Sequence, residues 1–400
     1  MKILIFNTLY FPNIVGGAEK SVQLLAERLL QRGHTPVIVS SSKEDKINVI
    51  NGVKVYYLKY RNLYWASESN DKSKMKKVIW HGLDNYNPFL ETKISEIISI
   101  EKPDVVHTNN LVGLSTLPWI SAKKHNIPIV HTLRDFSLMC SKGTMFRDSK
   151  NCKDRCVECS ILTEFKKYMT NKNYVNYVIG NSKFMVNRHK ELGFFRDVPS
   201  KRIYNGAVIR NESSNKKIKS ENHNNKPIKF FYMGRIEETK GVNLLLNTFK
   251  NISQAELLLA GKVTDNKIQS DIDNKSYPDN IKFLGYIDPE DILPDIDVLI
   301  APSLWNEPLP RVILEAYSHE VPVIGSTRGG IPECIIHNET GFLFNPDIKE
   351  EFERIVTNIV EKPELLSTFK PNIKSYIKQF DIEKSVDDYI TTYNSVCQNK

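Results

Sequence analysis

The chain has 400 residues, which is long for a single hydrophobic core, so two domains are the natural expectation. Its 40% hydrophobic and 26% charged residues are an ordinary globular balance, and no apolar run approaches the ~18 residues of a membrane-spanning helix. The net charge of +8 favours acidic partners such as phosphates, nucleotides or anionic lipid surfaces. Without a dense Arg/Lys helix it does not indicate nucleic-acid binding.

The first residues, MKILIFNTLYFP, are too short and too broken for a signal peptide and lack a small-residue cleavage site. We therefore expect a cytoplasmic protein, in which six cysteines do not indicate a disulfide framework.

The first half alternates predicted strands and helices. Apolar strands are predicted at residues 2–7, 34–42, 104–109 and 127–133. Between the first two strands, helical spacing is kept by Ala18, Val22, Leu25 and Leu29, and Gly33 follows as a stop. This rhythm predicts a parallel sheet with right-handed crossovers.

A polar stretch rich in Asn, Lys and Ser, residues 208–228, is typical of a linker. Further strands are predicted at 229–235, 255–261, 281–286, 297–303 and 321–326, with helices beginning near 241 and Pro310. We expect an N-terminal domain over 1–207, a C-terminal domain over 229–375, and a helix over 376–400 that packs back on the first domain. Two such doubly wound α/β domains would hold a ligand in the cleft between them.

Four loops carry candidate ligand-binding residues. In NIVGGAEKS (13–21), Gly16 and Gly17 follow the first strand and would allow close approach of a phosphate to a helix N-terminus, although an ordinary turn is as plausible. The pattern is not the GxGxxG of a dinucleotide site. In GRIEETKG (234–241), Arg235 and Lys240 end a strand and suit a diphosphate, the alternative being solvated loop charge.

The third loop, NEPLPRVILEA (306–316), holds two carboxylates. Glu307 follows a strand, and Glu315 lies about a turn and a half into the next helix. They could hold different parts of one extended ligand, the first taking sugar hydroxyls and the second ribose hydroxyls. Taken alone, this motif would more simply be two surface glutamates. The later GSTRGGIPE (325–333) predicts a turn and a helix start or a ligand contact.

With these motifs in this order, the chain resembles the retaining glycosyltransferases of family 4. The resemblance spans most of the chain and includes GGAE (16–19), PDVVHTNN (103–110), NG (205–206), MGRIEETKG (233–241), FLGY (283–286), EPLPRVILEA (307–316), VPVIGSTRGGIPE (321–333) and NETGFLFNP (338–346). It implies the GT-B architecture, in which two doubly wound, Rossmann-like α/β domains face each other across a cleft.

The resemblance also implies a nucleotide-diphosphate sugar donor held by the C-terminal domain. Arg235 and Lys240 match the diphosphate contacts, Glu307 the carboxylate that reads donor sugar hydroxyls, and Glu315 the one that binds ribose. The backbone around Leu309 and Pro310, with the Gly16–Gly17 turn, would complete the phosphate cradle. Retention would proceed by attack on the face of the leaving group, with cationic groups stabilising the diphosphate and no catalytic cofactor or metal.

One departure concerns the active site. Many relatives carry a His-Asp pair after the strand that here reads IPIVHTLRDF, and this slot holds Arg134 and Asp135, with His131 three residues earlier. The catalytic candidates are therefore Arg134, Asp135, His131 and Glu307. Positions 131 and 134 of a strand point to opposite faces, so we expect His131 to face the core and Arg134 to act electrostatically on the donor. His107 is a weaker candidate.

Four of the six cysteines fall in one window, at Cys140, Cys152, Cys156 and Cys159. Four thiolates ending in Cys-x-x-Cys predict a structural zinc, with an iron–sulfur cluster or simply free cysteines as alternatives. Some relatives share a cysteine-rich insertion here.

Lysines interleaved with apolar residues in KSKMKKVIW (72–80) and EFKKYM (164–169) allow peripheral contact with anionic lipid, although a solvated helix face is the simpler reading of each. The resemblance implies a saccharide or lipid-linked acceptor at the inner face of a membrane, in O-antigen, capsule or exopolysaccharide biosynthesis.

Two alternatives stay open: another GT-B enzyme such as a nucleotide-sugar epimerase, and a non-catalytic sugar-nucleotide-binding or scaffold subunit.

Overall fold

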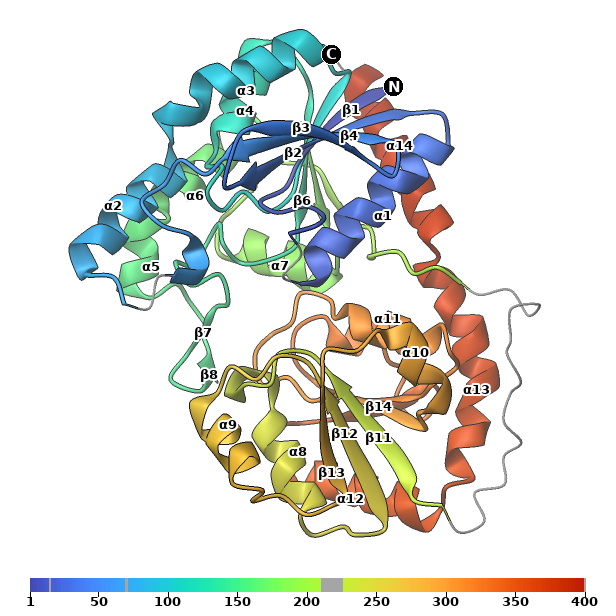
Figure 1. Cartoon of the computed structure of the whole chain (residues 1–400). Helices are drawn as coiled ribbons and strands as arrows, with labels where there is room; N and C mark the ends of the chain where they lie inside the picture. The colour runs from blue at the N-terminus through green and yellow to red at the C-terminus, as the bar shows by residue number, and fades with distance from the viewer. Residues whose placement is uncertain (14–15, 69–70, 210–225, 399–400) are drawn as a thin grey trace. The chain divides into compact units, whose positions relative to one another are not determined.

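The computed structural model describes residues 1–13, 16–68, 71–209 and 226–398, so most of the predicted linker lies outside the described residues. The chain divides into two compact units (Figure 1). Unit 1 comprises Met1–Met145, Cys152–Gly206 and Ile382–Lys400, and unit 2 comprises Phe146–Asn151 and Ala207–Asp381.

Unit 1 is built on an eight-stranded sheet with the order β10-β9-β6-β5-β1-β2-β4-β3. Its strands are β1 (Lys2–Phe6), β2 (Thr35–Ser42), β3 (Lys46–Ile50), β4 (Val53–Lys59), β5 (Val105–Thr108), β6 (Ile129–Leu133), β9 (Tyr177–Gly180) and β10 (Ser200–Arg202). All neighbours are parallel except β3, which pairs antiparallel with β4. The parallel sheet predicted from the strand–helix rhythm is therefore confirmed.

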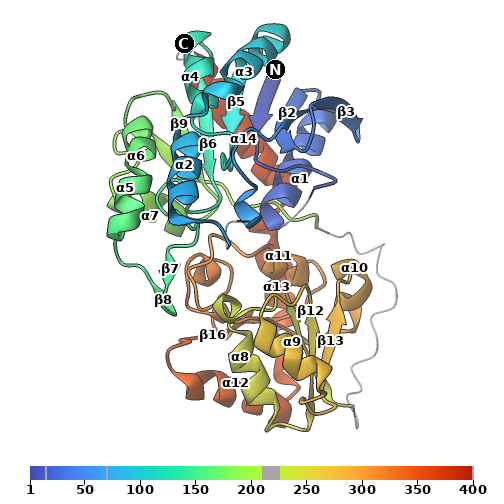
Figure 2. The same cartoon turned by 60° about the vertical axis from the view of Figure 1, so that its left-hand side comes forward.

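Helices cover both faces of this sheet (Figure 2). They are α1 (Gly17–Gln31), α2 (Lys74–Asn85), α3 (Pro88–Glu101), α4 (Leu117–Lys124), α5 (Val157–Leu162), α6 (Glu164–Thr170), α7 (Lys183–Glu191) and α14 (Ile382–Gln398), with a short 3₁₀ turn at Ala66–Glu68. Because strand side chains alternate, Ile3 and Ile5 of β1 join the core under α1 and α14, while Leu4 and Phe6 are buried on the opposite face.

The return of the chain to unit 1 begins later than predicted. Residues 376–381 stay with unit 2, and only α14, from Ile382, packs with α1 and β6. On this helix Ser385 donates to the carbonyl of Tyr204 (3.1 Å) and Tyr393 pairs with the His107 ring (2.8 Å). Within unit 1, Gly206 has no room for a side chain, because a Cβ there would meet Ile382 Cα at 2.6 Å.

Unit 2 carries a six-stranded parallel sheet with the order β13-β12-β11-β14-β15-β16. Its strands are β11 (Ile228–Met233), β12 (Ala255–Ala260), β13 (Ile281–Gly285), β14 (Val298–Ala301), β15 (Val323–Ser326) and β16 (Gly341–Phe344), with a separate two-residue hairpin of β7 (Phe146–Arg147) and β8 (Lys150–Asn151). Its helices are α8 (Val242–Phe249), α9 (Asn266–Asp273), α10 (Pro289–Ile292), α11 (Arg311–Tyr317), α12 (Lys349–Glu361) and α13 (Leu365–Tyr376). Short 3₁₀ turns lie at Glu238–Lys240, Leu293–Asp295, Ile331–Glu333 and Ile377–Phe380.

Each sheet has one point where the strand order reverses. In unit 1 it lies between β1 and β5, and in unit 2 between β11 and β14. Helical crossovers leave this point on opposite faces, so the loops after its two strands diverge and leave room for a ligand at their carboxyl ends. The fold therefore directs attention to the loops after β1 and β5, and to those after β11 and β14. Within the described residues, no helix is both long enough and apolar enough to span a membrane.

Candidate active site

The two loops at the switch point of unit 2 contain most of the predicted donor-binding residues. Arg235 and Lys240 follow β11, and Glu307 follows β14. The Lys240 ammonium forms an ion pair with the Glu307 carboxylate, and both side chains are largely buried. The structure thus joins the loops across the point at which a parallel α/β sheet binds ligands.

Glu307 is held through one of its two carboxylate oxygens. Oε1 accepts from Lys240 Nζ, from Ser303 Oγ (2.8 Å) and from Trp305 Nε1 (3.1 Å). Among the described residues, Oε2 receives no hydrogen bond. The Lys240 ammonium also lies 4.9 Å from the centre of the Trp305 ring. The carboxylate is therefore fixed in direction and keeps one oxygen able to accept from a ligand hydroxyl.

Two glycines explain why this loop can close so tightly. A Cβ on Gly329, whose φ is +58°, would come within 2.2 Å of the Glu307 carbonyl oxygen, and one on Gly241 (φ +76°) would meet the Pro302 carbonyl at 2.1 Å. The N–H of Gly330 donates to the Glu307 carbonyl (2.7 Å). The GSTRGGIPE turn therefore supports the Glu307 loop through its backbone.

The other predicted donor residues in unit 2 make separate pairs. Arg235 is 53% exposed at its side chain and pairs with Glu237 (3.2 Å). Glu315, on α11, pairs with Arg311 one turn earlier (3.6 Å). Leu309 is buried and Pro310 is the residue before the first turn of α11. The described contacts do not link these residues to the Lys240–Glu307 pair.

In unit 1, Arg134 follows the end of β6 and is only 8% exposed. Its guanidinium donates to Asn109 Oδ1 (2.8 Å), Asn205 Oδ1 (2.6 Å) and the Tyr389 hydroxyl (3.4 Å). All three partners are neutral, and among the described residues no carboxylate lies within ion-pair distance. The positive charge is thus oriented but not neutralised, which suits an anionic ligand.

The neighbours of Arg134 have different surroundings. Asp135 is half-buried and accepts from the backbone N–H (2.8 Å) and hydroxyl (2.6 Å) of Ser137, while burial raises the pKa of its carboxyl. His131 pairs with Thr108 Oγ1 (2.8 Å) and stacks on Phe195, and burial lowers its pKa to about 3. His131 therefore lies in the core as a neutral ring, as its strand position predicts.

His107 is also buried in the core of unit 1. It lies between Thr132 and Tyr393, each 2.8 Å from a ring nitrogen, and burial holds its pKa well below the ordinary value. Both ring nitrogens have protein partners, so His107 has a structural role and is not positioned to contact a ligand.

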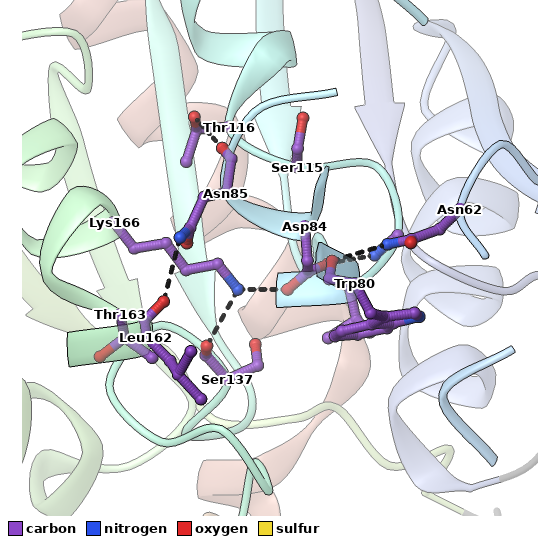
Figure 3. Close-up of polar contacts among 12 residues, drawn as sticks. Asn62, Trp80, Asp84, Asn85, Ser115, Thr116, Ser137, Leu162, Thr163 and Lys166 are labelled. Atoms are coloured by element: carbon purple, nitrogen blue, oxygen red, sulfur yellow. Dashed lines mark hydrogen bonds and ion pairs between the residues drawn. The ribbon is translucent and has the colours of Figure 1, made fainter. Parts of the chain in front are cut away.

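A buried ion pair supports the loop that follows Arg134. Figure 3 shows Lys166 of α6 pointing between the carboxylate of Asp84 on α2 (2.5 Å) and the carbonyl of Ser137 (3.2 Å). The other oxygen of Asp84 accepts the N–H of Gly113 (2.5 Å), in the loop after β5. One charged pair thus joins α2 and α6 to the two loops at the carboxyl ends of β5 and β6. No motif indicated Asp84, and Lys166, which the EFKKYM pattern placed on a lipid-facing or solvated surface, is buried instead.

The glycine turn after β1 is exposed. The N–H of Gly16 donates to the carboxylate of Glu19 (2.8 Å), which occupies one donor of the predicted phosphate cradle at the start of α1. Gly17 is the first residue of the helix. Two residues of the same motif, 14 and 15, lie outside the described residues.

The predicted zinc ligands gather only in part. Cys140 is buried, and hydrogen bonds from the Cys159 thiol and from backbone N–H groups, including that of Met145 (3.4 Å), lower the pKa of Cys140 to about 6. Within the residues that the structure describes, no group of three or more His, Cys, Asp or Glu side chains is arranged to hold a metal ion. Among the described residues, none of these four cysteines forms a disulfide. The arrangement gives the structural zinc no support, and it stays a prediction for elemental analysis.

Comparisons with known proteins match both halves of the chain. The family model "Glycosyltransferase Family 4" matches residues 15–209, and "Glycosyl transferases group 1" matches residues 213–376. An uncharacterised 42.6 kDa protein in the cps region of Klebsiella pneumoniae is 32% identical over 335 residues, covering 83% of this chain and 87% of that protein.

Two solved structures show the same fold. Sucrose-phosphate synthase from Thermosynechococcus elongatus is similar with a TM-score of 0.78 and 19% identity, over 100% of both chains. HepE of Anabaena, solved in complex with UDP-glucose, gives a TM-score of 0.72 and 18% identity over 99% of this chain and 100% of the other. These likenesses establish the GT-B architecture, with two Rossmann-like domains, that the motifs predicted.

Proposed function

Because the chain belongs to the glycosyltransferases described by the group 1 and family 4 models, we propose that it transfers a hexosyl unit from a nucleotide-diphosphate sugar, with retention, to a saccharide or lipid-linked saccharide acceptor. The observation that carries this proposal is the Glu307 carboxylate. It is fixed through Oε1 by three donors and has Oε2 left for a sugar hydroxyl, at the switch point of a parallel sheet.

The charges in the two units support the chemistry. The acceptor hydroxyl oxygen bonds to the anomeric carbon on the face from which the diphosphate leaves, and the acceptor proton passes to the departing diphosphate. Arg235 and Lys240 stabilise the negative charge that develops on that group, and Arg134 adds a guanidinium with no carboxylate partner in the described structure. In this proposal the protein's own cations carry the stabilisation without a metal ion.

The setting we propose is the assembly of a bacterial surface polysaccharide. It is supported by the relative from the cps region of Klebsiella pneumoniae, and by the likeness of fold to WaaG, a glycosyltransferase involved in lipopolysaccharide biosynthesis. The enzyme would act in the cytoplasm, at the inner face of the membrane where lipid-linked acceptors are extended.

Exposed apolar side chains on α2 and α5 support contact with that membrane. On α2 the side chains of Met75, Val78 and Ile79 are solvent-exposed and stand among lysines, and α5, which packs beside α2, exposes Val157 and Ile161. Apolar side chains flanked by lysines suit the surface of an anionic bilayer.

The donor site is tested by a thermal-shift panel of UDP, GDP, ADP, UDP-glucose, GDP-mannose and ADP-glucose. A ligand at a hundred times its dissociation constant adds about 2.7 kcal/mol of stability. Nucleotides of one base should therefore raise the melting temperature more than those of the other bases. Glu307→Gln should weaken the sugar conjugate more than the free nucleotide, because the sugar hydroxyls lose the carboxylate whereas Lys240 keeps its positive charge for the diphosphate. Glu361→Gln, at the exposed end of α12, makes the same charge change as a control. A panel in which wild type responds to nothing would reject the proposal.

Membrane contact is tested separately by flotation with vesicles of phosphatidylglycerol and of phosphatidylcholine. The wild type should float with the anionic vesicles, and the double variant Met75→Asp, Ile79→Asp should not. The double variant Ser99→Asp, Ile100→Asp is the matched control, because it makes the same charge change at exposed positions of α3. Equal flotation of all three proteins would remove the membrane part of the proposal.

A further inference from the structure

The hairpin of β7 and β8 lies within the cysteine window, between Cys140 and Cys152, but none of its own residues was a candidate for a site. Its register pairs Phe146 with Asn151 and Arg147 with Lys150. The turn residues Asp148 and Ser149 both have left-handed φ values, +50° and +56°. Two such residues form a tight two-residue turn whose twist matches that of the strands. By its contacts this short segment belongs to unit 2, although the chain on either side of it belongs to unit 1.

The hairpin binds the main chain of the Glu307 loop through one side chain. Asn151 Nδ2 donates to the carbonyl of Leu304 (2.8 Å), and the N–H of Asn306 donates to Asn151 Oδ1 (2.8 Å). The two hydrogen bonds lie on either side of Trp305. At the tip of the same hairpin, Ser149 Oγ donates to Glu238 Oε1 (2.6 Å), next to the loop that carries Lys240.

The main chain fixed in this way sets the direction of the candidate donor-binding groups. The Trp305 ring donates to Glu307 Oε1, and the ring in turn lies against the Lys240 ammonium. Other supports reach the same segment: the N–H of Leu304 donates to the Thr239 carbonyl (3.0 Å), and Asn306 Oδ1 accepts from Gly329 N–H (3.1 Å). Asn151 is the support that engages both an acceptor and a donor of the loop's own backbone.

We infer that Asn151 is a positioning residue for Glu307, and that the hairpin Phe146–Asn151 thereby sharpens recognition of the donor's sugar. The inference rests on the proposed function, because the sugar is the part of the donor that Glu307 would read. Replacing Asn151 with alanine removes the side-chain partners of the Leu304 carbonyl and the Asn306 N–H. The backbone conformation of residues 304–306 is then less restrained. The phosphate contacts of Arg235 lie on another loop and should be unaffected.

The first measurement is hydrogen–deuterium exchange on the ligand-free protein. In Asn151→Ala the amides of residues 304–307 should exchange at least about tenfold faster than in wild type, because the Asn306 N–H loses its acceptor. Lys150→Ala is the matched control, since Lys150 is exposed in the same hairpin and should leave this exchange unchanged. Equal exchange in Asn151→Ala and wild type would overturn the inference without reference to any ligand.

The second measurement separates positioning from general damage. Titration calorimetry compares UDP with UDP-glucose, and the GDP and ADP pairs in the same way, using whichever pair wild type binds best. In Asn151→Ala the sugar conjugate should lose about tenfold in affinity while the free nucleotide changes less than about twofold. Equal losses for both ligands, or no loss, would overturn the positioning role. If wild type binds no pair, the donor site itself is rejected, and the role of Asn151 falls with it.

Discussion

Arg134 and His131 are three residues apart, but their side chains lie in different environments. Arg134 lies just beyond β6, held by Asn109, Asn205 and the Tyr389 hydroxyl with its charge uncompensated by any described carboxylate. His131 lies within the strand as a buried neutral ring. A fixed cation at the carboxyl edge of a sheet can stabilise a leaving anion, whereas a neutral core ring contributes through packing.

We therefore expect Arg134→Ala to lower turnover by at least about a hundredfold, in the range found when one oriented electrostatic donor is removed. His131→Ala should lower the free energy of unfolding but change turnover by less than about threefold once the folded fraction is accounted for. Both would be measured as steady-state turnover of the sugar nucleotide identified by the panel. A larger kinetic effect at His131 than at Arg134 would reverse the assignment.

Some of these residues could be predicted from the sequence, and their environments could not. The position after an apolar strand places Arg134 at a sheet edge, and Pro310 marks the start of α11 correctly. The partners of Arg134 come from the residue after β5, from the segment after β10 and from α14, so only the fold brings them together. In the same way, no spacing rule indicates that Asn151 would reach the Glu307 loop.

At the scale of elements, apolar runs revealed most of the parallel strands of both sheets. The missed strands are of two kinds: β4, β9 and β16 carry apolar runs that had not been assigned as strands, and the others have a different pattern. The edge strand β3 is mostly exposed, and β10 and the β7–β8 hairpin are only two or three residues long, too short for any periodicity. The four-cysteine spacing predicted a metal site, but spacing along the chain does not determine which sulfurs the fold brings into contact.

The Asp84–Lys166 pair is buried on both sides and joins elements that do not neighbour one another in sequence. Lys166→Met should destabilise the protein by about 3–5 kcal/mol, because it leaves the Asp84 carboxylate buried without its partner. The double variant Lys166→Met, Asp84→Asn should recover much of that loss, since the amide oxygen can still accept from Gly113. Chemical denaturation would measure both. A double variant no more stable than the single one would show that the pair itself is needed.

Acid should weaken unit 1 through its buried histidines. Burial lowers the pKa of His131 to about 3 and that of His189 to about 4, so both rings are neutral in the folded chain at neutral pH. Because the unfolded chain binds the proton at about pH 6.5, stability is lost as the pH falls below that value. From pH 7 to pH 5, His131 alone should cost about 2 kcal/mol.

Calorimetry at the two pH values checks this prediction. His131→Gln, which cannot take up the proton but keeps an acceptor for Thr108, should show a smaller loss between pH 7 and pH 5 than wild type. An identical pH dependence in the two proteins would mean that His131 is not responsible.

At the scale of the whole molecule, the last helix completes the first unit. The α14 residues Val386, Tyr389, Tyr393 and Val396 are buried in one core with β1 and α1. Tyr393→Ala should lower the free energy of unfolding of unit 1 by about 3–5 kcal/mol, the cost of removing a buried aromatic ring. Tyr393→Phe keeps the ring and loses only the hydrogen bond to His107, so it should cost about 1 kcal/mol.

Urea denaturation followed by exchange at peptides from each unit would measure these changes. The loss should appear in unit 1 and leave the exchange of unit 2 unchanged, because Tyr393 packs only in the first core among the described residues. A loss of equal size in both units would indicate that they unfold as one.

The placement of α14 also determines when the core of unit 1 can be completed during synthesis. A ribosome makes β1 to β10 first, but the helix that covers their Ile3–Ile5 face is made after every strand of unit 2. Unit 1, covered on this face by α1 but not yet by α14, therefore exposes the part of the apolar face that α14 packs on until unit 2 has been synthesised. A nascent chain arrested before Ile382 should consequently bind a hydrophobic chaperone, and one released after Gln398 should not.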